Sequence, residues 1–299
     1  MNGYKKIFRN KKLRFKLLSM LRFIPDKQML RLQYWIKHHR KLNLKDPKRY
    51  TEKIQWYKLY YRNPAMQQCA DKYKVRQYIE SKGLGHILNR LYAVFTSPEE
   101  ICLEALPDEF VLKLSNGSGT NLLVEDKAKL DIEQVRKSFR DFDAQRESSA
   151  GREWVYRGER DAVIVAEALL KDPDRPQGDL CDYKILCFNG NPEYVVYDTD
   201  RFTEHKRNIY DTQWNDLRIG SDCPCIDGDI PKPDTLEEML EIARILSADF
   251  PAARIDLYSI GGKVYFGEIT FFPWSGYVNF DPDSFDFDLG KKFVLPKAE

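Results

Sequence analysis

The chain has 299 residues, of which 42% are hydrophobic and 13% aromatic, enough for a sizeable core in about two domains. The formal net charge is +2, and no run of 18 or more apolar residues occurs, so we expect no transmembrane helix. The N-terminus is too rich in lysine and arginine for a signal peptide. The six cysteines are scattered apart from Cys223-Pro-Cys225, which is a poor zinc signal, so we expect free thiols and a cytoplasmic location.

The charge is distributed unevenly along the chain. Residues 1–50 hold 16 Lys and Arg but only Asp26 and Asp46 as acids, whereas the remainder holds 32 basic and 44 acidic residues. A basic arm on an acidic body favours an anionic partner for the arm, such as the inner face of a membrane; we expect no nucleic acid. Residues 4–24 form either an amphipathic helix on that membrane or a helix packed on the body with a solvated basic face. Their apolar side chains at roughly helical spacing are Ile7, Leu13, Leu17, Leu18 and Leu21.

Periodicity and turn residues predict the elements in chain order. Strands broken by helices indicate an α+β fold with mostly antiparallel sheets. Neither a dinucleotide-binding nor a P-loop glycine motif occurs. The expected helices are 28–43, 51–82, 131–144 and 236–250, and the expected strands are 91–95, 110–115, 122–126, 163–170, 182–190 and 192–200, followed by a hairpin over 254–273.

Residues 110–121, FVLKLSNGSGTN, predict an apolar strand that runs into a small polar loop. Backbone N–H groups of such a loop can cradle a phosphate, because glycine allows close approach and leaves the amides unshielded. Lys113, on the strand before the loop, supplies a cation. The alternative is an ordinary hairpin loop beside an exposed lysine. The loop residues are Asn116, Gly117, Ser118, Gly119 and Thr120.

The hairpin RIDLYSIGGKVYFGEITFFP (254–273) carries charged side chains inside apolar strands. A two-residue loop, Gly261-Gly262, would pair Asp256 with Gly267, whereas a three-residue loop that includes Lys263 would pair Asp256 with Glu268. The three-residue loop is favoured because it gathers four apolar side chains on the opposite face: Ile255, Leu257, Tyr265 and Ile269.

In that register two carboxylates lie about 5 Å apart across the strands and would repel each other. Hard oxygen ligands on rigid strands suit Mg²⁺, whose remaining positions go to water and nucleotide phosphates. Arg254, two residues before Asp256, can hold an anion beside the metal. The alternative is a solvated sheet face with a local salt bridge.

Two further groups of polar side chains follow apolar strands. Lys184 is flanked by Ile, Leu, Cys and Phe, so it is either partly buried and paired with an anion or a solvent-facing edge lysine. A basic cluster after the strand at 192–200 can hold phosphates or substrate carboxylates, or is a solvated loop. Its members are Arg201, His205, Lys206 and Arg207.

The order of these segments resembles the ATP-grasp superfamily, and most of all its TupA-like branch, which is associated with teichuronopeptide and surface-polysaccharide synthesis. The likeness covers about residues 50–290 and rests on ADKYKVRQYI, FVLKLSNGSGTN, VAEALL, DYKILCFNG, RIDLY and GEITFFP. It implies an ATP-grasp fold, with the nucleotide held between two α+β subdomains. The segments it implies are a basic helical arm (1–50), a helical pre-grasp region (51–109), a small subdomain with the phosphate loop (110–170) and a large subdomain with the metal and substrate sites (171–299).

The resemblance also implies roles for individual residues. Lys72 and Lys113 match the phosphate-binding lysines, and the loop 116–121 would close over the phosphates. Asp256, Glu268 and Thr270 match the Mg²⁺ ligands, although Thr270 stands where the general pattern has Asn. Arg254 and Lys113 would be catalytic. Positions that match the adenine-binding segment are Glu167, Ala168, Leu169, Leu170 and Lys184. Leu114 follows Lys113 where many relatives have proline, and the ribose-binding acid is Asp172, Asp174 or Asp179.

The family chemistry is an ATP- and Mg²⁺-dependent ligation, in which a carboxylate forms an acyl phosphate and an amine then displaces phosphate to give an amide. The context implies a uronic-acid-containing surface polysaccharide or its precursor as one substrate. Candidate substrate-binding residues are Arg201, His205, Lys206, Arg207, Trp274 and Tyr277. One alternative is a glycosyltransferase in which Asp198-Thr199-Asp200 holds a metal and a sugar nucleotide. Another is a non-catalytic scaffold in a polysaccharide assembly complex.

Overall fold

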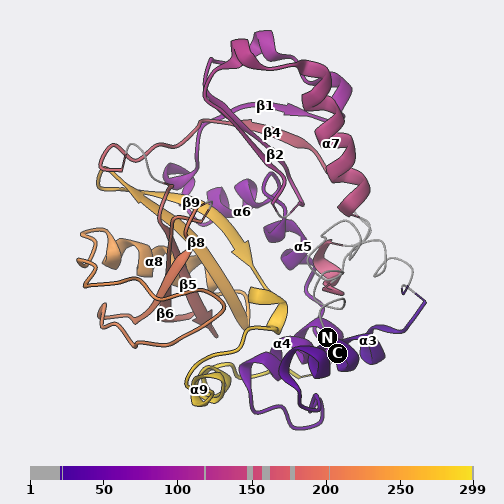
Figure 1. Ribbon diagram of the computed structural model, residues 1–299, viewed down its shortest axis with the longest axis vertical. Helices are drawn as coiled ribbons and strands as arrows, with labels where there is room; N and C mark the ends of the chain where they lie inside the picture. The colour runs from indigo at the N-terminus through magenta and orange to yellow at the C-terminus, as the bar shows by residue number, and fades with distance from the viewer. Residues whose placement is uncertain are drawn as a thin grey trace. The chain divides into compact units, whose positions relative to one another are not determined.

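The computed structural model describes residues 21, 23–117, 119–146, 151–156, 162–175, 179–201 and 203–297. The helix predicted over 4–24 lies almost entirely outside this part of the chain. The chain divides into two compact units (Figure 1). Unit 1 comprises the described residues up to Leu42 together with Leu91–Leu169, and unit 2 comprises Asn43–Arg90 and Leu170 onward.

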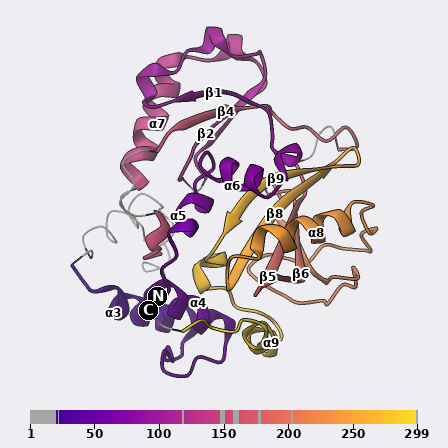
Figure 2. The same cartoon turned by 180° about the vertical axis from the view of Figure 1, so that it is seen from behind.

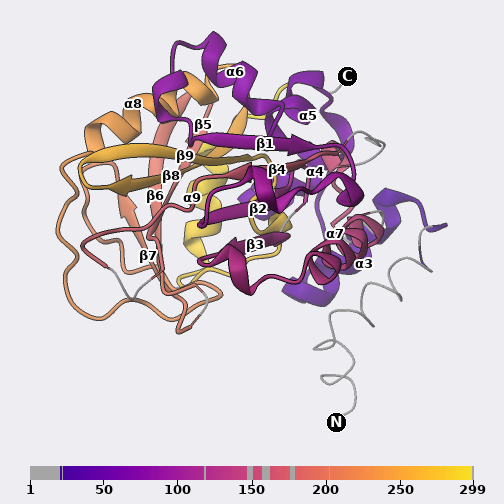
Figure 3. The same cartoon turned by 90° about the horizontal axis from the view of Figure 1, so that it is seen from above.

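Unit 1 is built on a four-stranded antiparallel sheet with the order β1-β4-β2-β3 (Figure 3). Helix α7 packs beside this sheet, and Phe139 of α7 is buried in the same apolar cluster as Phe110 and Leu112 of β2. Helix α3 lies N-terminal to the sheet in sequence. The elements of unit 1 are α3 (Asp26–His38), β1 (Leu91–Phe95), β2 (Phe110–Leu114), β3 (Asn121–Val124), α7 (Ile132–Arg146) and β4 (Ile164–Glu167).

Unit 2 is built on a five-stranded antiparallel sheet with the order β7-β6-β5-β8-β9. Helix α8 packs against β5, β6 and β8 (Figure 2) and covers the face that carries Ile185, Cys187 and Ile255. The elements of unit 2 are α4 (Tyr50–Tyr60), α5 (Pro64–Ala70), α6 (Val75–Ser81), β5 (Asp182–Phe188), β6 (Asn191–Thr199), β7 (Lys206–Asp211), α8 (Leu236–Ser247), β8 (Ala252–Ile260), β9 (Lys263–Thr270) and α9 (Ser284–Lys292).

The predicted α+β class with antiparallel sheets is confirmed, while three local predictions need correction. The helical stretch expected over 51–82 is three helices, because Asn63-Pro64 starts a new helix at α5 and the carboxylate of Asp71 accepts bonds from the backbone of the following turn. Strand β7 was not expected. Helix α9 was not expected either, although Asp286 on it accepts hydrogen bonds from the backbone N and hydroxyl of Thr51 at the start of α4.

The expectation for the cysteines agrees with the structure. All six cysteines, each in the described part of the chain, are free thiols. Within the described ranges, no helix combines the length and apolar character that a membrane span requires.

Candidate active site

The β8–β9 hairpin brings Asp256 and Glu268 opposite each other, as expected, but its loop and its strand pairing differ from those predicted. Its loop has two residues, not three: Ile260 pairs with Lys263, and Gly261 and Gly262 have φ values of +55° and +73°. A bulge then inserts Gly267 between the pairs Leu257–Phe266 and Asp256–Glu268. The extra residue restores the predicted carboxylate pair. It also places Phe266, and not Tyr265, on the apolar face with Leu257.

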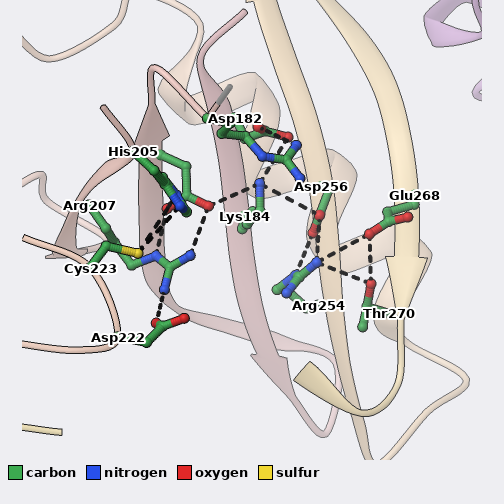
Figure 4. A network of polar contacts seen from close by, with 12 residues as sticks. Asp182, Lys184, His205, Arg207, Asp222, Cys223, Arg254, Asp256, Glu268 and Thr270 are labelled. Carbon is green, nitrogen blue, oxygen red and sulfur yellow. Dashed lines mark hydrogen bonds and ion pairs between the residues drawn. The ribbon is translucent and has the colours of Figure 1, made fainter. Parts of the chain in front are cut away.

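Arg254 lies between these two carboxylates and binds both (Figure 4). Its Nε and Nη2 atoms each donate to Asp256 at 2.7 Å, and Nη2 also donates to Glu268 Oε1 at 3.2 Å. Thr270 donates its hydroxyl to the same Glu268 oxygen at 3.2 Å. Asp256 is 3% exposed, whereas 44% of the Glu268 side chain is exposed, so Glu268 is the member of the pair that reaches solvent.

The two carboxylates differ in acidity because their surroundings differ. Desolvation would raise the pKa of Glu268, but the charges of Lys72, Arg254 and Lys184 outweigh it and lower that pKa to about 2. Desolvation prevails at Asp256 and raises its pKa, against the opposing charges of Arg254 and Lys184. The predicted phosphate ligand Lys72 therefore lies within electrostatic reach of the hairpin, in unit 2.

Lys184 occupies the centre of the polar sheet face and is buried, as one of the two interpretations of the sequence required. Its register partner on β8 is Asp256. Its Nζ lies 2.8 Å from Asp182 Oδ1, 3.3 Å from Asp198 Oδ2 and 3.9 Å from Asp256 Oδ2. This lysine is held by three carboxylates, of which only Asp182 was not singled out from the sequence.

The basic cluster predicted to bind substrate forms ion pairs along the same face. Arg207 is 5% exposed, and its Nε donates to Asp198 Oδ1 at 2.5 Å. His205 Nε2 lies 3.2 Å from Asp198 Oδ1, and His205 Nδ1 lies 3.4 Å from Cys223 Sγ. Arg201 donates to Asp182 at 2.8 Å. Burial alone would raise the pKa of Asp198, but its bonds to Arg207 and the charge of Lys184 lower it.

Lys206 lies apart from those ion pairs, in the wall of a pocket of about 480 Å³. The pocket lining also includes Asp200, which forms a 2.8 Å ion pair with Arg175. Asp198 and Asp200 of the D-x-D alternative thus have different partners among the described residues. The other lining residues are Thr199, Thr203, Glu204, Ile226 and Asp227.

The other two candidate substrate residues belong to a strained turn that follows β9. Trp274, Ser275 and Gly276 have φ values of 50°, 55° and 67°, a left-handed run that is costly for the two non-glycine residues. Lys58 of α4 holds the turn by donating to the carbonyl and the hydroxyl of Ser275, both at 2.8 Å. The Trp274 ring lies 5.4 Å from Arg207 Cζ, and the Tyr277 ring lies 5.0 Å from Lys58 Nζ. Sequence reasoning had no signal for Lys58.

The expected phosphate loop and the first three residues of the expected adenine segment are in unit 1, which ends at Leu169. Leu170 and Lys184 belong to unit 2. Lys113 of β2 forms a 2.8 Å ion pair with Glu167 at the end of β4; Ala168, Leu169 and Leu170 follow that strand. In the loop, Asn116 is 5% and Thr120 is 8% exposed. Neither atom of the Asn116 amide, nor the Thr120 hydroxyl, has a hydrogen-bond partner in the described part of the chain. Ser118 lies outside the described residues. Buried polar groups of this kind normally have a partner, so the loop has unused capacity for a ligand.

The donor set of the hairpin fits Mg²⁺ in one particular mode. Within the described ranges, no group of three or more His, Cys, Asp and Glu side chains forms a cage for a metal ion. Mg²⁺ is usually held by one or two carboxylates, with its remaining positions filled by water and substrate phosphates. Asp256 and Glu268 can therefore supply protein ligands for a Mg²⁺–nucleotide complex but not for an isolated ion. Thr270 as a third ligand stays a prediction, since its hydroxyl bonds Glu268 here.

The antiparallel α+β architecture, the Arg-x-Asp strand paired with a Glu-x-Thr strand, and the buried lysine beside them agree with the resemblance to the ATP-grasp class, apart from Thr270 in place of Asn. Residues 52–294 match the family model described as TupA-like ATP-grasp. The chain therefore belongs to the TupA-like ATP-grasp family, and the resemblance noted from the sequence is confirmed.

Several solved structures are similar to the chain. They include a D-alanine–D-alanine ligase from Bacillus anthracis complexed with ATP (16% identity, TM-score 0.41, 68% of this chain and 54% of that one). The ATP-grasp ligase PsnB, complexed with a precursor variant, Mg and ADP, has 10% identity and a TM-score of 0.43 over 82% and 66% of the two chains. N5-carboxyaminoimidazole ribonucleotide synthetase from Thermus thermophilus has 10% identity and a TM-score of 0.39; the match covers 71% of this chain and 48% of that one. The chain spans about half of the first of these structures. A comparison with curated proteins found no match.

Proposed function

We propose that the protein is an ATP- and Mg²⁺-dependent carboxylate–amine ligase. The observation that carries the proposal is the register of the β8–β9 hairpin, which sets Asp256 opposite Glu268 with Arg254 between them. A structural salt bridge would need one acid for one arginine. Here a second, solvent-reaching carboxylate of very low pKa stands beside a buried ion pair. Membership of the ATP-grasp family supports the same assignment.

The reaction would have two steps. A substrate carboxylate attacks the γ-phosphorus of ATP and releases ADP, which leaves an acyl phosphate. An amine then attacks the acyl carbon, loses a proton and releases inorganic phosphate, which gives the amide. Mg²⁺ bound to Asp256, Glu268 and the phosphates would supply charge neutralisation. Arg254 would stabilise the negative charge on the acyl phosphate and on its tetrahedral adduct, sharing Asp256 with the metal.

The remaining candidate residues would bind the nucleotide and the substrate. Lys72 and Lys184 supply positive charge near Glu268, and Lys113 supplies it beside the loop 116–120. The amide of Asn116 and the hydroxyl of Thr120, which have no hydrogen-bond partner among the described residues, support a ligand-binding role for that loop. Family context suggests that the carboxylate belongs to a hexuronic acid of a surface glycan, and the amine to an amino acid or amino sugar. We place the reaction in the cytoplasm, where ATP is available.

The test is ATP-dependent phosphate release with panels of uronates and amines, comparing wild type with Glu268→Gln. The expected result is release that requires both partners and Mg²⁺, reduced by at least ~10²-fold in the variant, because a charged metal ligand is lost. Glu237→Gln on α8, whose side chain is 74% exposed, is the matched control and should behave as wild type. Full ligation by Glu268→Gln would refute the metal assignment.

Nucleotide preference separates the proposal from its rivals. A ligand that binds only the folded state raises the melting temperature in proportion to the logarithm of its concentration over Kd. We expect Mg²⁺-ATP to raise it. Stabilisation by a UDP-sugar but not by ATP would favour the glycosyltransferase, and no response to any nucleotide would favour a scaffold.

A further inference from the structure

The ammonium group of Lys184 lies closest to carboxylates other than the one opposite it in the sheet (Figure 4). The pairing of β5 with β8 sets Lys184 directly opposite Asp256, where a side-chain ion pair is the simplest contact. Its Nζ atom nevertheless lies 3.9 Å from Asp256, but 2.8 Å from Asp182 and 3.3 Å from Asp198. The lysine is thus drawn along the sheet face toward Asp182 and Asp198 and away from the hairpin.

Asp182 and Asp198 are held in place by two arginines. The two carboxylates belong to register partners on β5 and β6. Arg201 donates to Asp182 Oδ2 at 2.8 Å, which leaves Oδ1 to Lys184. Arg207 donates to both oxygens of Asp198, at 2.5 and 3.1 Å. Because each carboxylate is anchored by its own arginine, neither can follow Lys184 toward the hairpin.

Burial makes the position of this ammonium group important. Asp182 is 2% and Asp198 is 1% exposed, so neither carboxylate reaches a ligand in solution, and both act through the side chains that they bind. Lys184 and Asp256 are also buried, and charges interact more strongly there than in water. At contact distance the ammonium would compete with a metal ion for the carboxylate of Asp256.

We propose that Asp182 and Asp198 are positioning residues that hold Lys184 back from the hairpin and so keep its carboxylates available to Mg²⁺. The inference rests on the proposed ligase function, in which Asp256 and Glu268 bind Mg²⁺ together with the nucleotide phosphates. Lys184 then stays close enough for its charge to favour the phosphates, but it does not occupy the place of the metal ion.

The test is the Mg²⁺ dependence of nucleotide binding, measured as the rise in melting temperature of the full chain at a fixed ATP concentration. In Asp198→Asn we expect Lys184 to move to Asp256, and the Mg²⁺ concentration that gives half of the full rise to increase about 10-fold. That is the order expected when a unit charge approaches from 3.9 Å to contact distance at an effective dielectric constant of about 20. Excess Mg²⁺ should restore the wild-type rise, whereas a general structural defect would reduce the rise at every Mg²⁺ concentration.

Two further variants attribute the effect to Lys184. Asp182→Asn should raise the Mg²⁺ midpoint in the same direction. It is the milder change, because Arg201, which loses its partner, is 41% exposed and can be solvated, and it decides the question if Asp198→Asn does not fold. In a Lys184→Met background, Asp198→Asn should leave the midpoint within about 2-fold, because no ammonium is left to move.

The matched control is Asp222→Asn, which should keep the wild-type Mg²⁺ midpoint. Asp222 is 51% exposed and pairs with Arg207, and in the described part of the chain it forms no ion pair with Lys184. An unchanged midpoint in both Asp198→Asn and Asp182→Asn, or an equal shift in the absence of Lys184, would overturn this inference and leave the ligase proposal intact. A wild-type protein that ATP does not stabilise at any Mg²⁺ concentration would overturn both.

Discussion

Lys58 of α4 and Ser275 of the turn after β9 are joined by two hydrogen bonds of 2.8 Å, although 217 residues separate them. Lys58 is 1% exposed, so its charge is compensated inside the protein and not by solvent. The bonds oppose the strain of the left-handed residues Trp274 and Ser275, which costs of order 1–3 kcal/mol for each such residue. Lys58 thus holds the turn that carries Trp274 beside Arg207.

Lys58→Met should therefore release the turn. We expect unfolding to become easier by about 1–3 kcal/mol, as for other lost hydrogen bonds to a charged donor, and the KM for the carboxylate substrate to rise while the affinity for ATP is unchanged. Urea denaturation and steady-state kinetics measure both effects. Lys53→Met is the matched control: Lys53, on the same helix, donates at 2.7 Å to the carbonyls of Gly290 and Phe293, away from the turn. Equal KM values for the two variants would contradict the positioning role.

Gly267→Val should disrupt the bulge that aligns the hairpin. A Cβ at this position would lie 2.9 Å from the backbone oxygen of Asp256, a contact that the strand can relieve only by moving. We expect a loss of about 1–3 kcal/mol in the free energy of unfolding and weaker Mg²⁺-ATP binding. Denaturant unfolding and nucleotide titration test this. Gly85→Ala, whose added Cβ would meet nothing closer than 3.6 Å, should change neither quantity.

The two carboxylates of the hairpin should differ in their importance for stability. Asp256→Asn leaves the buried Arg254 without its main counter-ion, which costs about 3–5 kcal/mol in comparable buried pairs. Glu268→Gln removes a half-exposed carboxylate and should cost no more than about 1 kcal/mol. Chemical denaturation of both variants at pH 7 gives the comparison. A larger loss for Glu268→Gln would show that Glu268 is mainly structural.

The stability contribution of Glu268 should also depend on pH in a defined direction. Its pKa in the folded protein is about 2, below the ordinary value of 4.5, so the folded state favours the ionised form. The contribution is therefore fully present above pH 4.5 and is lost as the pH falls toward 2. The difference in unfolding free energy between wild type and Glu268→Gln should shrink as the pH falls from 4.5 toward 2. A difference that grows on acidification would be inconsistent with this assignment.

Thr120→Val should separate stability from nucleotide binding. The buried Thr120 hydroxyl has no hydrogen-bond partner in the described part of the chain, so its replacement by a methyl group should leave the unfolding free energy within about 0.5 kcal/mol or raise it. The increase in melting temperature caused by Mg²⁺-ATP should be smaller than in wild type. Thermal scans with and without nucleotide provide the measurement. A marked destabilisation without nucleotide would show that the hydroxyl has a structural partner.

The sequence predicted the strands well where a short apolar run is bounded by polar residues, as at 91–95 and 110–114. It did not predict β7, because the buried polar residues Arg207 and Asn208 make that strand look like a solvated loop until Asp198 of β6 is known to lie beside it. It did not predict α9 because that helix is fixed by Asp286 bonding Thr51, 235 residues away. Contacts between distant segments leave no local pattern to read.

The residues of the candidate site were likewise predictable only in part. Arg254, Asp256 and Glu268 could be selected because charged residues are conspicuous inside apolar strands, and their pairing followed from the hydrophobic pattern. Lys58 and Asp182 could not be selected, since nothing near them in sequence marks them as partners of Ser275 and Lys184. The loop length was predicted wrongly because a three-residue loop and a two-residue loop with a bulge place Asp256 and Glu268 in the same register.

That equivalence bears on how homologous hairpins diverge. Twelve positions separate Asp256 from Glu268 whether the additional residue sits in the loop or at Gly267. A relative can therefore move the irregularity from one end of the hairpin to the other by point substitutions alone, with no insertion or deletion, and keep its two carboxylates aligned. Insertion of one residue within a paired strand, outside the loop, would instead turn one carboxylate away from the other. Selection should thus act on the length of this interval more strongly than on the identity of the residues within it.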